Sequence, residues 1–109
     1  MLLHEEIQKD NWLKNDYVQT VYGEKTSSRS SWAARWCLMG HIDKHGDPFL
    51  KRWRIYRDLS RTIKVLYPER VPKFLGFTGW PSPVIAFRFN DHFLTTLDDI
   101  QRVCKVSGH

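Results

Sequence analysis

The clearest pattern of apolar and polar positions lies in residues 48–66, PFLKRWRIYRDLSRTIKVL. The apolar positions that recur every three or four residues are Leu50, Trp53, Tyr56, Leu59, Ile63 and Leu66. This spacing is typical of one face of an α-helix. Pro68 has no amide hydrogen to continue a helix, so we expect the helix to end before it. The pattern predicts a long amphipathic helix whose apolar stripe lies in the core.

Three further segments have helical patterns. Residues 2–17 place their apolar side chains roughly along one side, and residues 30–46 begin with two serines that can cap a first turn. In residues 95–108, two threonines precede a pair of aspartates, which favour the N-terminal end of a helix dipole. We expect each of these segments to be a helix.

Extended structure is expected in only two short places. Residues 17–22 alternate in the manner of a strand, and the segment VIAFRF, residues 84–89, fits either a short strand or an irregular buried segment. A small pairing between residues 17–22 and 84–88 is the most sheet that we expect. The sequence therefore predicts one small, mainly α domain over residues 1–109, with about four helices.

Composition supports a stable core without disulfides, because 41% of the 109 residues are hydrophobic and 14% are aromatic. The two cysteines lie in amphipathic segments, which favours reduced thiols and a cytoplasmic protein. The first residues lack the pattern of an export signal, and no apolar run is long enough to cross a membrane. With five Trp, six Phe and four Tyr, the chain has aromatic residues to spare for contact with a partner.

Positive charge is concentrated in residues 51–73, where eight Lys and Arg stand against Asp58 and Glu69, a net charge of +6. The cationic positions of the predicted helix are Lys51, Arg52, Arg54, Arg57, Arg61 and Lys64. They lie opposite or beside its apolar stripe and could contact phosphates, with Trp53 adding a stacking surface. The alternative is that these charges only solvate an amphipathic helix.

Cys37, His41 and His45 recur every four residues in one predicted helix and are candidate metal ligands. Cys37 and His45 would be about 12 Å apart at about 1.5 Å per residue, so all three cannot hold one ion. Cys37 with His41 could, if Cys104 or His92 completed the site. The sequence has no CxxC pair and no HExxH motif, so we expect neither a metal nor another cofactor.

A cysteine-dependent hydrolase would use Cys37 as the nucleophile, His92 as the base and Asn90 or Asp91 to orient it. Against this, Cys37 is expected more than a turn inside its helix, where the dipole no longer lowers a thiol pKa. We therefore favour Cys37 as a small buried hydrophobic residue, with Gly40 at a point where another helix crosses.

Three short motifs carry a family resemblance: Trp12, the run Cys37-Leu38-Met39-Gly40, and Asn90-Asp91 followed by Thr96, Asp99 and Ile100. In order and separation they resemble a domain of unknown function found in short bacterial and bacteriophage proteins, with the last motif slightly stretched. The resemblance spans roughly residues 3–106 and departs at residues 17–30 and 73–83. It implies a mostly helical fold in which the Asn-Asp pair and the capped last helix form a structural corner, and it implies no activity.

Two hypotheses of function follow, and neither is enzymatic. The first is a binding module that docks on a protein partner, such as a phage or mobile-element product acting on a host protein, with Trp53 and Trp80 as anchors. The second is a nucleic-acid binder that uses the basic helix at residues 51–64. The cysteine-dependent hydrolase is a further alternative.

Overall fold

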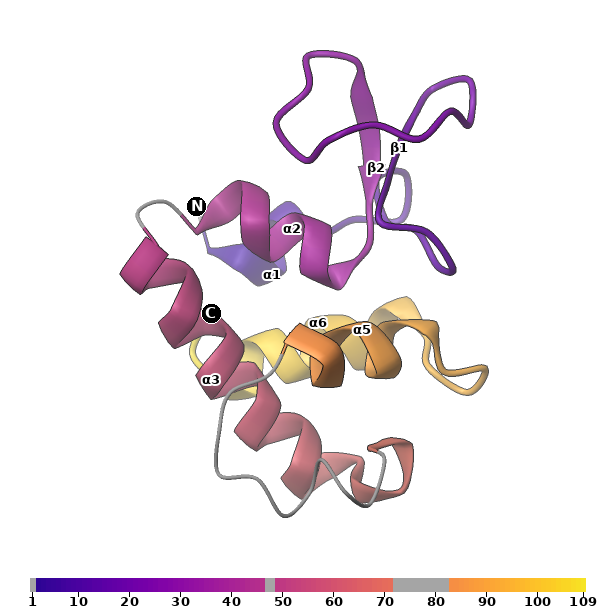
Figure 1. The fold of residues 1–109 in the computed structure, drawn as a ribbon. Coiled ribbons are helices and arrows are strands. Elements are labelled where there is room, and N and C mark those ends of the chain that lie inside the picture. Colours follow the sequence, from indigo (N-terminus) through magenta and orange to yellow (C-terminus); the bar gives the residue numbers. More distant parts are fainter. Residues whose placement is uncertain (1, 47–48, 72–82) are drawn as a thin grey trace.

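The computed structural model describes residues 2–46, 49–71 and 83–109 (Figure 1). Its elements are helices α1 (Leu3–Glu6), α2 (Leu38–His45), α3 (Phe49–Leu66), α5 (Pro83–Asp91) and α6 (Leu97–Val106), strands β1 (Val18–Thr20) and β2 (Ala33–Trp36), and the 3-10 turn η1 (Pro68–Arg70). The expected mainly α fold with one short β hairpin is confirmed. None of the helices in the described ranges combines the length and the apolar composition that a membrane span requires.

One core joins the helices. Figure 1 shows α2 between the hairpin and α5, with α3 running across α5 and α6. The fully buried core residues include Leu3, Leu38, Ile42, Ile55, Leu59, Ile63, Ile85, Phe89, Ile100 and Val103. They come from all five helices, so each helix buries an apolar face against residues distant in the sequence.

The predicted long helix is confirmed as α3, but its first turns were assigned to the wrong environment. Leu50 and Trp53 are 66% and 38% exposed, whereas Ile55, which the predicted stripe omitted, is buried. An 18-residue helix is about 27 Å long at about 1.5 Å per residue, which is more than two crossing helices cover. The N-terminal turns of α3 lie at the edge of the molecule (Figure 1).

The helix predicted over residues 2–17 is limited to Leu3–Glu6. Ile7 has extended backbone angles, φ −82° and ψ 112°. Beyond Ile7, the Asn11 side chain bonds to two backbone groups that a continuing helix would use. Its Oδ1 accepts from Gln8 N at 2.8 Å, and its Nδ2 donates to Glu6 O at 2.9 Å. Such bonds compete with helix continuation, which is why the helix stops early.

The helix predicted to begin at Ser30 or Ser31 begins instead at Leu38. Residues Ala33–Trp36 form β2, which pairs antiparallel with β1 in the register Val18↔Trp36 and Gln19↔Arg35. The expected pairing of residues 17–22 with 84–88 is wrong, because residues Pro83–Asp91 form α5. Whether a segment forms a strand depends on a pairing partner elsewhere in the chain, and the periodicity of residues 30–46 gives no information about such a partner.

Gly40 lies where another backbone approaches α2, but that backbone belongs to the β1 segment rather than to a crossing helix. A Cβ atom at this position would lie 2.9 Å from Tyr17 O and 3.0 Å from Val18 Cγ2. Contacts this short force either the helix or the strand to move, so the position requires glycine.

We predict that Gly40→Ala lowers the free energy of unfolding, although alanine is the better helix former by about 1 kcal/mol. The clash with Tyr17 O should outweigh this gain, giving a net loss of about 1–3 kcal/mol. Urea denaturation followed by circular dichroism measures the change. A variant as stable as the wild type would contradict the close approach.

Candidate functional site

Asn90, at the end of α5, joins three segments through its buried side-chain amide. Its Oδ1 accepts from Trp12 Nε1 at 2.7 Å and from Leu38 N at 3.0 Å, and its Nδ2 donates to Leu13 O at 3.0 Å. Asn90 therefore satisfies the first free amide of α2 while it holds the chain around Trp12.

Asp91 extends the same corner. Its Oδ1 accepts from Asn90 Nδ2 and from Asn15 N, each at 2.9 Å. Asn15 has a φ of 62°, a left-handed conformation that asparagine tolerates better than most residues. The Asn90-Asp91 pair thus has a clear structural use.

The N-terminus of α6 is capped as expected. Thr96 Oγ1 accepts from Asp99 N at 3.3 Å, and Asp99 Oδ2 accepts from Thr96 N at 3.1 Å. This reciprocal pair satisfies two amides at the beginning of the helix.

Cys37 is fully buried, as expected. It was expected inside a helix, but it is the N-terminal cap of α2. Its Sγ accepts from Gly40 N at 3.3 Å. A helix N-terminus tends to lower a thiol pKa, but here burial outweighs it and raises the pKa of Cys37 to about 11. At neutral pH the side chain is therefore a thiol and not a thiolate.

The candidate catalytic residues Cys37, His92 and Asp91 do not form a catalytic triad. His92 Nδ1 accepts from Leu94 N at 3.2 Å, and its ring stacks on Phe93 with centroids 4.8 Å apart. Asp91 is bonded to Asn90 and Asn15, and the structure has no hydrogen bond between Cys37 and His92. The geometry thus lacks the contacts between nucleophile, base and orienting group that a cysteine hydrolase needs.

His41 is fully buried, and burial lowers its pKa to about 4, so its imidazole is neutral at pH 7. Its Nε2 lies 3.1 Å from Asn11 O and must carry the proton, because a carbonyl oxygen only accepts. His45 points elsewhere, with Nδ1 3.0 Å from Glu6 Oε2. In the part of the chain that the structure describes, no three His, Cys, Asp or Glu side chains are grouped as metal ligands.

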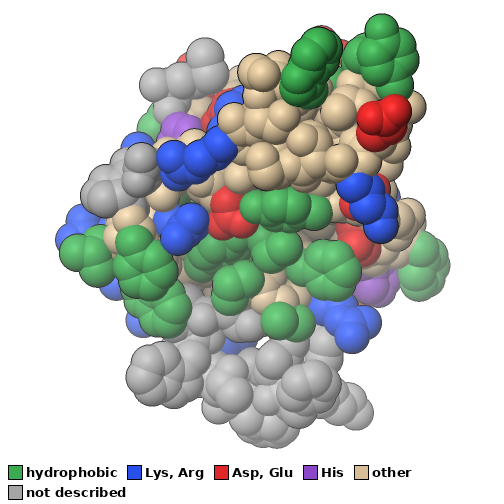
Figure 2. Space-filling model, turned by 45° about the horizontal axis from the view of Figure 1, so that its top comes forward, with side chains coloured by type: hydrophobic (Ala, Val, Ile, Leu, Met, Phe, Trp, Pro, Cys, Tyr) green, Lys and Arg blue, Asp and Glu red, His purple; other side chains and the backbone are tan. Residues whose placement is uncertain are grey.

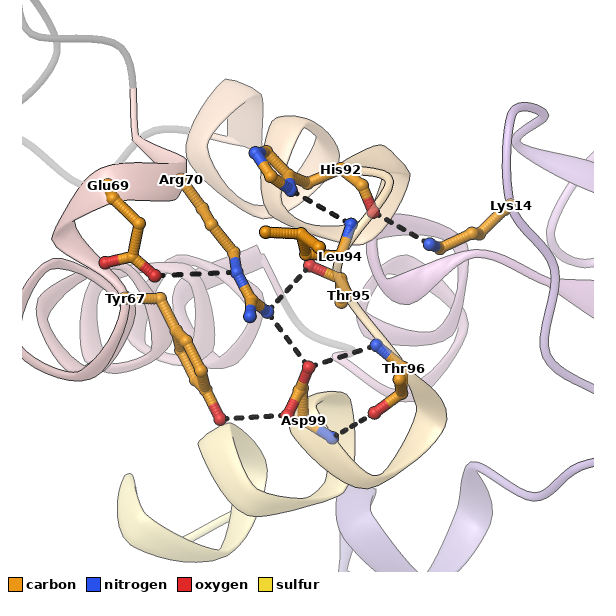
Figure 3. Close-up of polar contacts among 9 residues, drawn as sticks. All are labelled: Lys14, Tyr67, Glu69, Arg70, His92, Leu94, Thr95, Thr96 and Asp99. Carbon is orange, nitrogen blue, oxygen red and sulfur yellow. Dashed lines mark hydrogen bonds and ion pairs between the residues drawn. The ribbon is translucent and has the colours of Figure 1, made fainter.

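Arg70 forms a second polar cluster, which the sequence did not suggest (Figure 3). Its Nη1 donates to Thr95 Oγ1 at 3.2 Å and to Asp99 Oδ2 at 2.9 Å, and Tyr67 OH donates to Asp99 Oδ1 at 3.1 Å. Partial burial alone would raise the pKa of Asp99, but the hydrogen bonds from Arg70, Thr96 and Tyr67 lower it overall. The cluster ties η1 to the beginning of α6.

A hollow of about 460 Å³ adjoins Arg70 and is lined by Glu69, Arg70, Val71, Phe87, Arg88, Asp91 and His92. Its lining mixes two carboxylates with two guanidinium groups, and Arg70 is already bound to Asp99. The charges of the hollow therefore favour neither an anion nor a cation.

Asp58 lies among the six basic residues predicted on α3, and these residues differ in exposure. Lys51, Arg54 and Arg61 are exposed, and Lys64 is half-buried. Arg57 Nε donates to Asp58 Oδ1 at 3.1 Å, and Asp58 Oδ2 is 2.9 Å from His109 Nε2. These contacts place a carboxylate between the exposed cations.

Arg52 lies against an aromatic ring and close to a carboxylate. Its guanidinium carbon is 5.5 Å from the centroid of Phe49, and its Nε is 4.0 Å from Asp43 Oδ1. Of the other residues predicted to bind, Trp53 lies beside it on α3, whereas Trp80 is outside the described residues.

We define the α3 aromatic surface as Phe49, Leu50 and Trp53. Phe49 is 61% exposed, and its ring stacks on that of Trp53 with centroids 6.4 Å apart. The surface borders a hollow of about 380 Å³ lined by Met39, Asp43, Phe49, Arg52, Trp53, Tyr56 and Pro83. Figure 2 shows hydrophobic side chains gathered on one face of the molecule, with Lys and Arg side chains around them.

Asp43 lines this hollow and accepts two hydrogen bonds from tyrosines. Its Oδ2 accepts from Tyr17 OH at 2.6 Å, and its Oδ1 accepts from Tyr56 OH at 2.8 Å. Burial, and then the bond to Asp43, raise the pKa of Tyr17 to about 12. Burial, and then the negative charge of Asp43, raise the pKa of Tyr56. Both phenols stay protonated at neutral pH, so the link between the hairpin, α2 and α3 is maintained.

Comparisons of the chain with protein-family models, with curated proteins and with solved structures gave no match.

We predict that Cys37 and Cys104 react slowly with Ellman's reagent in the native protein. Burial raises their pKa values to about 11 and about 12. At neutral pH, moving a thiol pKa from about 8.5 to about 11 lowers the thiolate fraction more than about a hundredfold. Labelling should accelerate at least that much in denaturant. An exposed Ser31→Cys variant supplies the reactive control, and rapid native labelling of Cys37 would contradict the prediction.

We predict that Asp99→Asn destabilises the protein at pH 7 by about 1–3 kcal/mol, since it removes a charged partner of Arg70. The lowered pKa of Asp99 means that its stabilisation is present above the unfolded pKa of about 3.9 and is lost as the pH falls through the folded value. The difference from the wild type should therefore shrink in acid. Asp98→Asn, in the same exposed turn, is the control and should change stability little at any pH.

Proposed function

We propose that this protein is a non-enzymatic module that binds a protein partner through the α3 aromatic surface. One observation carries the proposal: Phe49, Leu50 and Trp53 expose large apolar areas beside one another at the beginning of one helix. Exposed apolar clusters on soluble domains commonly mark interaction sites. Trp53 and the adjacent Arg52 are also of the residue types that contribute most often to interface hot spots.

The surroundings of this surface favour a partner segment that carries both apolar side chains and carboxylates. Lys51, Arg52 and Arg54 flank the apolar residues, and the hollow between α2 and α3 can receive a side chain beside Trp53. Positive charge around an apolar centre accelerates association with an acidic partner and selects against basic ones. The bonds from Tyr17 and Tyr56 to Asp43 keep the hollow in one shape before binding.

Two alternatives have weaker support. The burial and raised pKa of Cys37 count against cysteine-dependent hydrolysis. Nucleic-acid binding by α3 is favoured by the exposure of Lys51, Arg54 and Arg61 but is opposed by Asp58 among them. A cytoplasmic setting accords with both cysteines being free thiols.

We predict that Trp53→Ala and Leu50→Ala each remove most of the binding to the partner. The test is affinity capture of the tagged protein from a lysate of its source cells, followed by titration of the recovered protein. Each substitution should weaken binding by about 2 kcal/mol or more, as expected for hot-spot residues. The stability of the Leu50→Ala variant should change by no more than about 0.5 kcal/mol, because Leu50 is 66% exposed.

Matched controls make the result specific to this surface. Val65→Ala changes an exposed apolar residue near the other end of α3, and Trp32→Ala changes an exposed tryptophan on the hairpin. Both should leave capture unchanged, and nuclease treatment should not release the partner. A partner that is lost on nuclease treatment, and also lost when Lys51, Arg54 and Arg61 are replaced together, would assign α3 to nucleic acid instead.

A further inference from the structure

Two aromatic side chains at the far end of the hairpin face solvent around one hollow. Tyr22 is 83% exposed and Trp32 is 74% exposed. Together with Thr20, Val21, Glu24, Lys25 and Thr26, they line a hollow of about 380 Å³. None of these residues belongs to the α3 aromatic surface. Rings of this size are usually buried or used for contact, so their joint exposure needs a separate explanation.

Backbone hydrogen bonds hold Tyr22 in a tight turn. Thr20 N donates to Glu24 O at 2.8 Å, and Gly23 N donates to Thr20 O at 3.0 Å. Thr20 Oγ1 also accepts from Tyr22 N at 3.3 Å. Gly23 has a φ of 80°, which a glycine adopts without strain. The turn therefore presents Tyr22 from a defined backbone.

Trp32 is presented in a similar way from the turn that precedes β2. Ser30 Oγ accepts from Trp32 N at 3.1 Å, and Ala33 N donates to Ser30 O at 3.1 Å just before β2 begins. A ligand that binds between side chains carried on an ordered backbone loses less free energy in ordering that backbone.

The charge of the hairpin indicates which ligand suits these rings. Residues 21–35 contain Lys25, Arg29 and Arg35 against Glu24, a net charge of +2. Lys25 and Glu24 both line the hollow, and Arg35, which is exposed on β2, adds to the positive charge of the hairpin. Exposed rings combined with cations suit a polymer of flat bases joined by phosphates, because any base can stack on a ring while Lys or Arg contacts the backbone.

We propose that the hairpin binds single-stranded nucleic acid, with Trp32 and Tyr22 stacking on bases and Lys25 contacting a backbone phosphate. A duplex keeps its bases paired and stacked, so it does not offer base faces to these rings. The proposal is independent of the protein partner, because it uses the hairpin and not α3.

Fluorescence anisotropy with a labelled oligouridylate of about ten nucleotides tests the proposal, since sites of this kind span about 4–16 nucleotides. In about 50 mM salt, the wild-type protein should bind the oligomer saturably. Trp32→Ala and Tyr22→Ala should each weaken binding at least about fivefold, because a base-stacking contact contributes about 1–3 kcal/mol. Lys25→Ala should weaken binding and reduce the salt slope by about 0.7.

Three comparisons distinguish stacking on the hairpin from general attraction to a basic protein. Trp32→Phe retains a ring and should retain most of the affinity, which also shows that the hairpin is folded. Trp53→Ala should bind like the wild type, and an unlabelled duplex of the same length should compete poorly. Absence of saturable binding by the wild type would overturn the proposal. So would unchanged binding by both alanine variants, or loss of binding only when Lys51, Arg54 and Arg61 are replaced.

Discussion

The buried amide of Asn90 is the interaction on which the rest of the structure depends. Its two polar atoms bond to Trp12, Leu13, Leu38 and Asp91, at sequence separations of up to 78 residues. Leaving one such buried group without a partner costs about 1–3 kcal/mol, a large part of a small domain's stability. The segment around Trp12, the beginning of α2 and the end of α5 must therefore meet in one arrangement.

That corner also determines where the hairpin stands. Trp36 N donates to Asn11 O at 2.8 Å, and Cys37 N donates to Tyr17 O at 2.9 Å, immediately before α2. Gly40 lets the β1 segment lie directly on α2. With its base held in this way, the hairpin carries Tyr22 and Trp32 away from the core, while Asp43 connects its Tyr17 to Tyr56 of α3.

Acidic residues divide the basic residues of the chain into structural and exposed groups. Asp43, Asp58 and Asp99 lie within salt-bridge distance of Arg52, Arg57 and Arg70 respectively. These arginines contribute to the link between α2 and α3, to the surface of α3, and to the link between η1 and α6. Lys51, Arg54 and Arg61 remain exposed along α3. Because other arginines lie beside carboxylates, the net charge of +5 is larger than the positive charge that α3 presents to a partner.

The sequence by itself determined the elements that are encoded locally. The long helix α3 follows from apolar residues at helical spacing, and α6 follows from the Thr96 cap with Asp99 and the apolar residues after it. The mainly α class of the fold was predicted correctly because most of the chain carries such local helical patterns. Trp53 and Arg52, which the sequence predicted to bind a partner, both line the hollow beside α3, whereas the apolar stripe had placed Trp53 and Leu50 in the core.

Only the tertiary structure decided the elements and surfaces that depend on distant partners. Residues Ala33–Trp36 are a strand because β1 and Asn11 supply their backbone hydrogen bonds, and Asn90 satisfies the first amide of the helix that follows. The Arg70 cluster needs Asp99, which lies 29 residues away. An aromatic residue is buried only where another element packs against the part of the helix or hairpin that carries it. Tyr22, Trp32 and Phe49 are exposed because they lie beyond those contacts, and no local pattern of residues encodes that position.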